Sequence, residues 1–254
     1  MSTLYLIATP IGNLGDMTAR ARECLSQLDV LACEDTRHTG NLLKLLDIPR
    51  PPMLLANHEF NERGLAPRLV EYLNAGKKVG ICSDAGYPLV SDPGYPAVVA
   101  AIAAGHDISV LPGASAVQPA LLMSGLPPSS YLFKGFPPRK PGQRRTFLKQ
   151  DADAPHTLIF YESPFRVAKL LAEALEVLGD RQAAVCLELT KQFERVSRGP
   201  LSALAQEFSD KKVKGEAVIV IAGHKAPKGA TPSDSEGGEG TDEPENDIAD
   251  DGDA

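Results

Sequence analysis

Short apolar runs alternate with amphipathic segments in the first half of the chain. The apolar runs occupy residues 4–8, 30–33, 79–82 and 108–111. Each is four or five residues long and bounded by polar or glycine-rich sequence, which is typical of a buried strand. Between most of them, apolar residues recur every three or four positions, as on one face of a helix. Strands that alternate with helices predict a largely parallel sheet covered on both sides.

Two of the predicted helices have recognisable ends. Thr18 is placed to cap the start of a helix that reaches Leu28. A second helix is predicted from Asn61 through Ala75, and Gly76 follows it as a typical C-terminal stop.

Four loops follow the four predicted strands, at residues 9–16, 34–39, 83–96 and 112–115. Parallel strands end at one edge of a sheet, and ligands bind beyond that edge, so we expect these loops to converge. The loop at 83–96 is rich in Gly, Pro, Ser and Asp. Loops of this length are uncommon unless they are functional, which favours a ligand-binding loop over an ordinary surface turn.

The second half of the chain predicts another α/β domain with a mixed sheet. Strands are expected at residues 131–134, 157–161, 183–187 and 217–222, with helices at 164–178 and 201–208, and residues 193–199 could form a further strand. We therefore predict an N-terminal domain at 1–113, a C-terminal domain at 114–224 and a tail at 225–254.

The net charge of −7 is concentrated in the tail. Residues 227–254 hold ten acidic residues and one lysine, which leaves 25 basic and 23 acidic residues in the rest of the chain. The tail has almost no large apolar side chain, so burial cannot offset the entropy cost of ordering it. We expect a disordered, solubilising tail on a nearly neutral body. At 43% hydrophobic residues, that body can bury a core.

Cysteine use and hydropathy restrict the class of protein. The cysteines, Cys24, Cys33, Cys82 and Cys186, form no C-x-x-C pair, so neither a metal site nor a disulfide framework is expected. The N-terminus lacks the pattern of a signal peptide, and no uncharged apolar run approaches membrane-spanning length. These features predict a soluble protein of a reducing compartment, the cytoplasm, without a membrane partner.

Three of the loops carry candidate chemistry, each with a structural alternative. Residues 9–16 form a glycine-containing turn that could hold a phosphate, but they match neither G-x-G-x-x-G nor the Walker motif. Residues 112–116 are small, which suits either a ligand or close helix–strand packing. Residues 33–39 contain Glu34 and Asp35, which could supply a general base or simply cap a helix. His58 belongs to a similar, weaker cluster.

Residues 131–150 hold six basic residues and no acidic ones, interleaved with phenylalanines. Prolines are expected to keep the middle of this segment extended. Lys and Arg could contact phosphates while an aromatic ring stacks on an unpaired base. The alternative is a solvated segment between domains whose phenylalanines lie in the core.

Taken together, eight segments occur in the order found in one known family. They are residues 9–16, 33–39, 83–94, 112–116, 133–138, 161–166, 188–191 and 214–216. The chain resembles the tetrapyrrole methylase superfamily, and more closely its branch of small-subunit rRNA (cytidine-2′-O)-methyltransferases, over roughly residues 3–224. The acidic tail lies outside the match.

The resemblance implies two α/β domains with S-adenosyl-L-methionine in the cleft between them, usually in a homodimer. The implied reaction is methyl transfer to the ribose 2′-hydroxyl of a cytidine in the decoding region of 16S rRNA, with free rRNA or the 30S subunit as partner. The cofactor residues predicted on this basis are Ile11, Gly12, Asp84, Tyr87, Val90, Ser115, Ala116, Tyr161, Leu187 and Ala217.

The remaining predicted site residues concern the substrate. Glu34 matches an acidic proton acceptor of tetrapyrrole-methylating relatives, and we expect it to act as the base, with His58 near the substrate. Asp84 and Asp92 are expected to shape their loop rather than do the chemistry. The predicted RNA contacts are Arg37, Arg139, Lys140, Arg144, Arg145, Arg166 and Lys191.

Three other functions compete with this one. A methyltransferase of corrin or porphyrin precursors would use the same cleft, but the basic, aromatic segment favours RNA. A noncatalytic RNA-binding module would share the fold alone. A nicotinamide oxidoreductase is the weakest alternative, because the dinucleotide fingerprint is missing.

Overall fold

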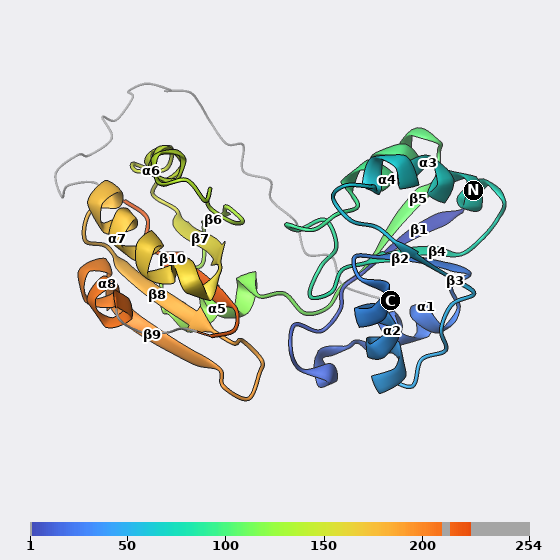
Figure 1. The fold of residues 1–254 in the computed structure, drawn as a ribbon, viewed down its shortest axis with the longest axis horizontal. Helices are drawn as coiled ribbons and strands as arrows, with labels where there is room; N and C mark the ends of the chain where they lie inside the picture. Colours follow the sequence, from blue (N-terminus) through green and yellow to red (C-terminus); the bar gives the residue numbers. More distant parts are fainter. Residues whose placement is uncertain (1, 210–213, 225–254) are drawn as a thin grey trace, which may run out of the picture. The chain divides into compact units, whose positions relative to one another are not determined.

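The first half of the chain folds into a five-stranded parallel sheet with the strand order β3-β2-β4-β1-β5 (Figure 1). The structure is a computed structural model that describes residues 2–209 and 214–224. The strands are β1 (Thr3–Ile7), β2 (Val30–Cys33), β3 (Met53–Ala56), β4 (Val79–Cys82) and β5 (Asp107–Leu111). Every pairing in this sheet is parallel, which confirms the predicted sheet type.

Helices cover both faces of this sheet (Figure 1). They are α1 (Ala19–Ser26) and α2 (Thr36–Leu45) on one face, and α3 (Glu62–Asn74) and α4 (Tyr95–Ala103) on the other. Alternate residues of β2 serve the two faces: Leu31 and Cys33 pack with α1 and α2, whereas Val30 and Ala32 pack with α3 and α4. This alternation explains why the strand is apolar at every position.

The second half forms a mixed five-stranded sheet, as predicted, with the order β6-β7-β10-β8-β9. Its strands are β6 (Tyr131–Phe133), β7 (Thr157–Glu162), β8 (Gln182–Leu187), β9 (Arg195–Pro200) and β10 (Ala217–Ile221). β6 and β7 are parallel and the other pairs are antiparallel. Its helices are α5 (Val117–Ser124), α6 (Pro141–Lys149), α7 (Val167–Leu178) and α8 (Leu201–Ser209).

The core of the second sheet is also two-sided. Phe160 and Leu158 pack with the apolar residues of α6, α7 and α8. Ile159, between them in the strand, packs on the opposite face with Val117 and Ala120 of α5. The α/β class predicted for this half is therefore confirmed.

Three elements differ from the prediction. β3 was missed because it is only half-buried and is preceded by prolines. α2 begins inside the segment read as a loop. α6 begins at Pro141, the last of the three prolines that predicted an extended chain, because Pro141 stands in the first turn of the helix, where its missing N–H costs nothing. Pro137 and Pro138 lie in a stretch that is neither helix nor strand.

The predicted helix caps give a mixed result. Thr18 caps α1, with its side chain accepting a hydrogen bond from the Ala21 N–H. Asn61 precedes α3 but makes no capping bond to it. Instead its Oδ1 accepts from the His58 N–H at 2.8 Å and its amide donates to the Ala56 carbonyl at 2.9 Å, so this side chain closes the turn before the helix.

The division into domains at residue 113 stays a prediction, and the predicted disorder of residues 225–254 lies outside the described residues. Within residues 2–209 and 214–224, no helix is both long enough and apolar enough to cross a membrane.

We predict that the second core sets the stability of its half of the chain. Phe160 is 1% exposed, so Phe160→Ala is expected to lower the free energy of unfolding by about 3–5 kcal/mol. Phe165→Ala is the matched control, because Phe165 is 84% exposed and its loss should change stability by no more than about 0.5 kcal/mol. Urea denaturation measures both, and equal effects would contradict the assignment of the core.

Candidate active site

Loops that follow the strands of the first sheet meet at its carboxyl edge, as predicted. Thr9 and Gly86 pair there through two backbone hydrogen bonds, 2.9 Å from Thr9 N to Gly86 O and 3.0 Å from Gly86 N to Thr9 O. A cavity of about 450 Å³ lies at this pair, within the range of about 300–1,000 Å³ usual for small-molecule sites. It is lined by Ile11, Glu34, residues 84–87 and 90–92, Ser115, Ala116, Phe136, and residues 161–164 and 215–218.

A larger cavity of about 890 Å³ adjoins the first. Ile11, Tyr87, Val90 and Ser115 line both cavities, so a ligand in the smaller one can extend toward the larger. Residues 112–115 form part of the second lining.

The loop after β4 holds an unusual backbone conformation beside the cavity. Leu89 and Ser91 have positive φ angles of 71° and 70°, which cost a non-glycine residue about 1–3 kcal/mol each. The Gly94 N–H donates to Glu62 Oε2 at 2.8 Å, which anchors the far end of the loop. Such conformations persist where the surroundings impose them, often at ligand sites, so they support the prediction of a ligand loop.

The small residues at 112–116 pack closely on the first sheet and also line the cavity, while their contact with a ligand stays a prediction. A Cβ atom on Gly113 would lie 3.0 Å from the Cβ of Ala8, so this glycine permits close packing on the end of β1. The Gly113 N–H also donates to the Tyr87 hydroxyl at 3.1 Å. Ser115 and Ala116 line the cavity, as the ligand explanation required.

Five carboxylates line the cavity, and three of them, Glu34, Asp84 and Asp92, come from loops of the first sheet. Partial burial raises the pKa of Glu34, and the negative charges of Asp84 and then Asp35 raise it further. Burial, followed by repulsion from Glu34, raises the pKa of Asp92 to about 6. Asp84 Oδ1 accepts a hydrogen bond from the Asp35 N–H at 3.3 Å and so ties the β2 loop to the β4 loop.

The neighbours of Glu34 have structural roles. Asp35 caps α2, accepting from the N–H groups of Arg37 at 2.8 Å and His38 at 3.4 Å. The Arg37 side chain, 91% exposed, pairs with the same carboxylate, and these hydrogen bonds from Arg37 lower the pKa of Asp35. The capping alternative is therefore confirmed for Asp35. His58 is exposed, stands 6.2 Å from the Phe60 ring between centroids, and does not line the cavity.

Most of the predicted cofactor residues share one cavity. The lining includes Ile11, Asp84, Tyr87, Val90, Ser115, Ala116, Tyr161 and Ala217. Gly12 does not line it; a Cβ there would lie 2.4 Å from Lys191 Cγ, so the glycine makes room for that lysine. Leu187 is 1% exposed, belongs to the core of the second sheet and does not line this cavity, so its cofactor contact stays a prediction.

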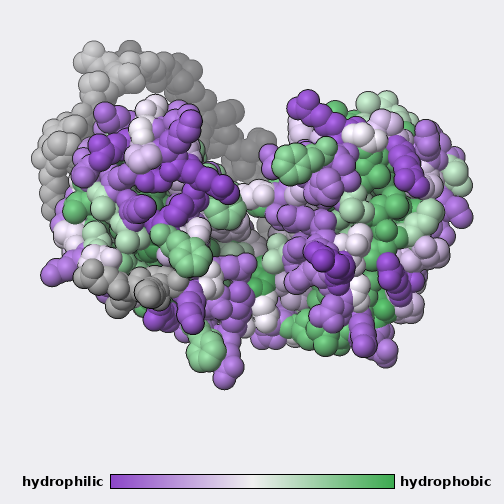
Figure 2. Space-filling view, in the orientation of Figure 1, coloured by the Kyte–Doolittle hydropathy of each residue, from purple (hydrophilic) through white to green (hydrophobic). Residues whose placement is uncertain are grey.

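Five of the seven predicted RNA-binding residues form ion pairs with carboxylates. Arg139 and Lys140 are exposed, and hydrophilic side chains predominate around α6 in Figure 2. The exposed Arg145 pairs with Glu176 at 2.9 Å. Arg166 Nε donates a hydrogen bond of 2.6 Å to Glu162 Oε1. Lys191 Nζ forms ion pairs with Glu188 Oε1 at 3.0 Å and with Glu216 Oε2 at 2.8 Å.

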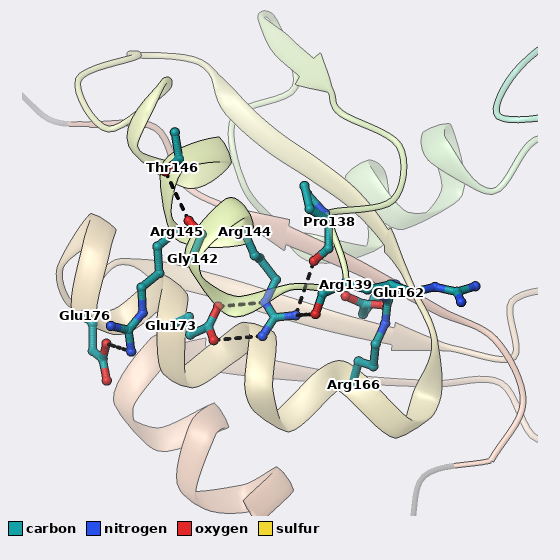
Figure 3. Close-up of polar contacts among 10 residues, drawn as sticks. All are labelled: Pro138, Arg139, Gly142, Arg144, Arg145, Thr146, Glu162, Arg166, Glu173 and Glu176. Atoms are coloured by element: carbon teal, nitrogen blue, oxygen red, sulfur yellow. Dashed lines mark hydrogen bonds and ion pairs between the residues drawn. The ribbon is translucent and has the colours of Figure 1, made fainter.

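The prediction that Arg144 contacts RNA is wrong. Arg144 is 2% exposed, and its guanidinium makes two hydrogen bonds of 2.7 Å to the carboxylate of Glu173 (Figure 3). Its remaining contacts are to backbone carbonyl groups within the same segment. A buried guanidinium with these partners is not available to a phosphate.

Four charged or aromatic lining residues were not predicted as site residues: Asp92, Phe136, Glu162 and Glu216. Each lies in a segment that the sequence singled out, at 83–94, 133–138, 161–166 and 214–216. The signal was therefore present as a motif. It did not show which side chain of the motif faces a ligand, because this depends on contacts across the sheet edge.

Comparisons with known proteins agree on one family. A family model described as "Tetrapyrrole (Corrin/Porphyrin) Methylases" matches residues 3–205. A protein of Streptococcus pyogenes serotype M1, named ribosomal RNA small subunit methyltransferase I, is 44% identical over 88% of this chain and 77% of its own length. Proteins of the same name from Xylella fastidiosa and Mesorhizobium japonicum are each 46% identical, over 87% and 91% of this chain and 81% and 78% of their own lengths.

Solved structures show the same fold at low identity. The methyltransferase CobJ superposes with a TM-score of 0.66 at 18% identity, covering 88% of this chain and 95% of its own. Uroporphyrin-III-C-methyltransferase from Thermus thermophilus gives 0.59 at 20% identity, covering 87% and 94%.

The methyl donor of this family is S-adenosylmethionine. The family match spans the first sheet and all strands of the second except β10, and the relatives of more than 40% identity cover most of the chain. The chain belongs to the tetrapyrrole methylase family.

Proposed function

We propose that the protein transfers a methyl group from S-adenosylmethionine to the 2′-hydroxyl of a cytidine in the decoding region of 16S rRNA. The observation that carries this proposal is the 44–46% identity, through both sheets, to proteins named ribosomal RNA small subunit methyltransferase I. The solved tetrapyrrole methyltransferases, at 18–20% identity, support the fold alone. By the family resemblance we further propose a cytoplasmic homodimer acting on free 16S rRNA or the 30S subunit.

The cavity at the sheet edge fits the methyl donor. Its lining combines apolar side chains such as Ile11 and Val90 with the hydroxyl groups of Tyr87 and Tyr161. The carboxylates of Glu34, Asp84 and Asp92 make it acidic, which complements a ligand that carries positive charge at its sulfur and its amino group. When bound, the donor supplies an activated methyl group for an in-line displacement.

The residues of the chain would supply position and a proton acceptor. In the displacement, the ribose oxygen forms a bond to the methyl carbon while the bond from that carbon to sulfur breaks and its electron pair stays on sulfur. Alignment of these atoms is mainly a problem of positioning. The ribose hydroxyl must also lose its proton, and Glu34 is the acceptor that we propose. Its raised pKa makes it a stronger base than an ordinary glutamate.

The RNA would be held outside the cavity by basic side chains. Arg139 and Lys140 are exposed, and neither forms an ion pair within the described residues. Phe136, 55% exposed, lines the cavity and packs edge-to-face on Tyr161 at 5.5 Å between ring centroids. An aromatic ring at the cavity beside free positive charges supports binding of an unpaired nucleotide.

The direct test of the proposed function is methylation of purified 30S subunits and of naked 16S rRNA with a labelled methyl donor. The account expects one methylated cytidine, with loss of labelling when 2′-deoxycytidine replaces it in a synthetic RNA target. Absence of labelling on both RNA substrates would overturn the proposal.

We predict that Glu34→Gln slows single-turnover methyl transfer by about 100-fold at saturating RNA and cofactor, because a general base contributes about 10²–10⁴ in rate. Cofactor affinity should change much less than the rate, because Asp84 and Asp92 still make the cavity acidic. Glu71→Gln, an exposed position in α3, is the matched control and should keep the normal rate. A normal rate in Glu34→Gln would exclude Glu34 as the base, and a large loss in Asp92→Asn alone would assign the role to Asp92.

The pH dependence provides a separate prediction. A base is active when ionised, so the single-turnover rate should fall as pH decreases through the raised pKa of Glu34. Asp84→Asn removes a negative charge that raises this pKa but retains an acceptor for the Asp35 N–H. The acid limb of the pH–rate profile should therefore move to lower pH. A limb that stays in place or moves upward would contradict the electrostatic assignment.

Neutralising Arg139 and Lys140 together should weaken RNA binding and make it less sensitive to salt. Loss of two phosphate contacts should reduce the slope of log K against log salt by about 1.4–1.8. The matched control is Arg63→Gln with Lys77→Gln, which removes the same charge from exposed positions in and just after α3. Filter binding at several salt concentrations measures both variants, and equal slopes for the two would refute an RNA-docking role.

A further inference from the structure

Arg144 connects three parts of the second half of the chain. From α6, its Nε and Nη2 donate to the two carboxylate oxygens of Glu173 in α7, both at 2.7 Å. Its Nη1 donates to the carbonyl groups of Pro138 at 3.3 Å and Arg139 at 3.1 Å. Figure 3 shows both carbonyl groups directed at the guanidinium, on the side away from Glu173.

The carbonyl groups come from a loop whose backbone pairs with β7 only at Lys134 and Gly135. Within the described residues, the backbone of residues 136–139 makes no hydrogen bond to other backbone groups. Residues 134–140 form neither helix nor strand, and Pro137 and Pro138 lack the N–H groups with which a loop usually closes turns. Buried or half-buried carbonyl groups need partners, and Arg144 supplies them here. The guanidinium thereby fixes the backbone between Phe136 at the cavity and Lys140 at the start of α6.

The ion pair between Arg144 and Glu173 is far more buried than the neighbouring pair between Arg145 and Glu176. Arg145 pairs with Glu176 across the same two helices, but the side chains are 50% and 59% exposed. The side chains of Arg144 and Glu173 are 2% and 11% exposed. Burying two charges carries a desolvation cost that their attraction often only balances, so a buried pair is better explained by the geometry that it imposes than by net stability.

We propose that Arg144 and Glu173 are positioning residues for the RNA substrate. They hold residues 136–140, which we name the proline loop, so that Phe136 stays at the cavity while Arg139 and Lys140 face the solvent. The inference rests on the proposed function, because the loop is taken to receive RNA. It assigns to Arg144 a role through the loop backbone, in place of the direct phosphate contact that the sequence suggested.

The loop can be observed without RNA. The chain contains no tryptophan, so Phe136→Trp introduces a single fluorescent reporter at a residue that is already 55% exposed. In this background, Arg144→Met with Glu173→Leu removes both buried charges together and leaves neither one unpaired. Arg144→Lys retains a charge for Glu173 but lacks the fork that also reaches the two carbonyl groups. Glu176→Leu, one turn further along α7, is the control.

Tryptophan quenching by acrylamide is measured in the Phe136→Trp background. Cofactor affinity, thermal stability, and KM for RNA together with kcat are measured in chains that keep Phe136, with the unsubstituted protein as parent. The double variant and Arg144→Lys should both show increased quenching and a KM for RNA raised about tenfold, with kcat and cofactor affinity within about twofold. Glu176→Leu should match its parent in every measurement. Should the double variant fail to unfold cooperatively, Arg144→Lys carries the test.

The outcomes separate this inference from the function on which it rests. If the parent protein methylates RNA and Arg144→Lys retains both its KM and its quenching, the positioning role is wrong. The same holds if KM and kcat change in parallel with thermal stability, which would indicate a merely structural pair. If the parent protein methylates no RNA, the proposed function itself fails, and the quenching data then report on the loop alone.

Discussion

Two hydrogen bonds between Thr9 and Gly86 join the loops that leave the carboxyl ends of β1 and β4. These strands are adjacent and parallel, but α1 and α4 cover opposite faces of the sheet, so the chain must diverge at this point and leave a crevice. The pair keeps the two loops together at the base of that crevice. A Cβ on Gly86 would meet Ile11 at 3.5 Å and the Ala114 carbonyl at 3.8 Å, so space is available. The requirement for glycine lies in its φ of 80°.

Negative and positive side chains occupy different places around the crevice. Carboxylates line the cavity, whereas the positive charges of Arg139 and Lys140 lie on the exposed loop beside it. This arrangement suits a cationic methyl donor inside and a polyanion outside. A carboxylate beside the sulfur would stabilise the reactant, whose positive charge disappears during transfer. A carboxylate beside the attacking oxygen stabilises the charge that develops there, so the position of Glu34 relative to the two atoms decides whether it accelerates the reaction.

Local patterns in the sequence predicted most of the fold. The strands of the first sheet, other than β3, follow from apolar runs, and the convergence of their loops follows from parallel topology. Prolines explain two wrong predictions. No strand was predicted at β3 because Pro51 and Pro52 precede it, and the start of α6 was predicted to be extended although Pro141 suits a first helical turn. The burial of Arg144 could not be predicted from the residues next to it in the sequence, because its partner Glu173 lies 29 residues away. The repulsion between Glu34 and Asp92 likewise exists only after two loops have met.

The central claim is that the methyl donor binds where the loops of the first sheet meet the second half of the chain. A crystal structure of the protein with S-adenosylhomocysteine, the product of the donor, tests this most directly. The account predicts the ligand in contact with Tyr87, Ser115, Ala116 and Tyr161, with its sulfur directed toward the side of the cavity that holds Glu34. A ligand bound elsewhere, or one whose sulfur faces away from Glu34, would contradict it.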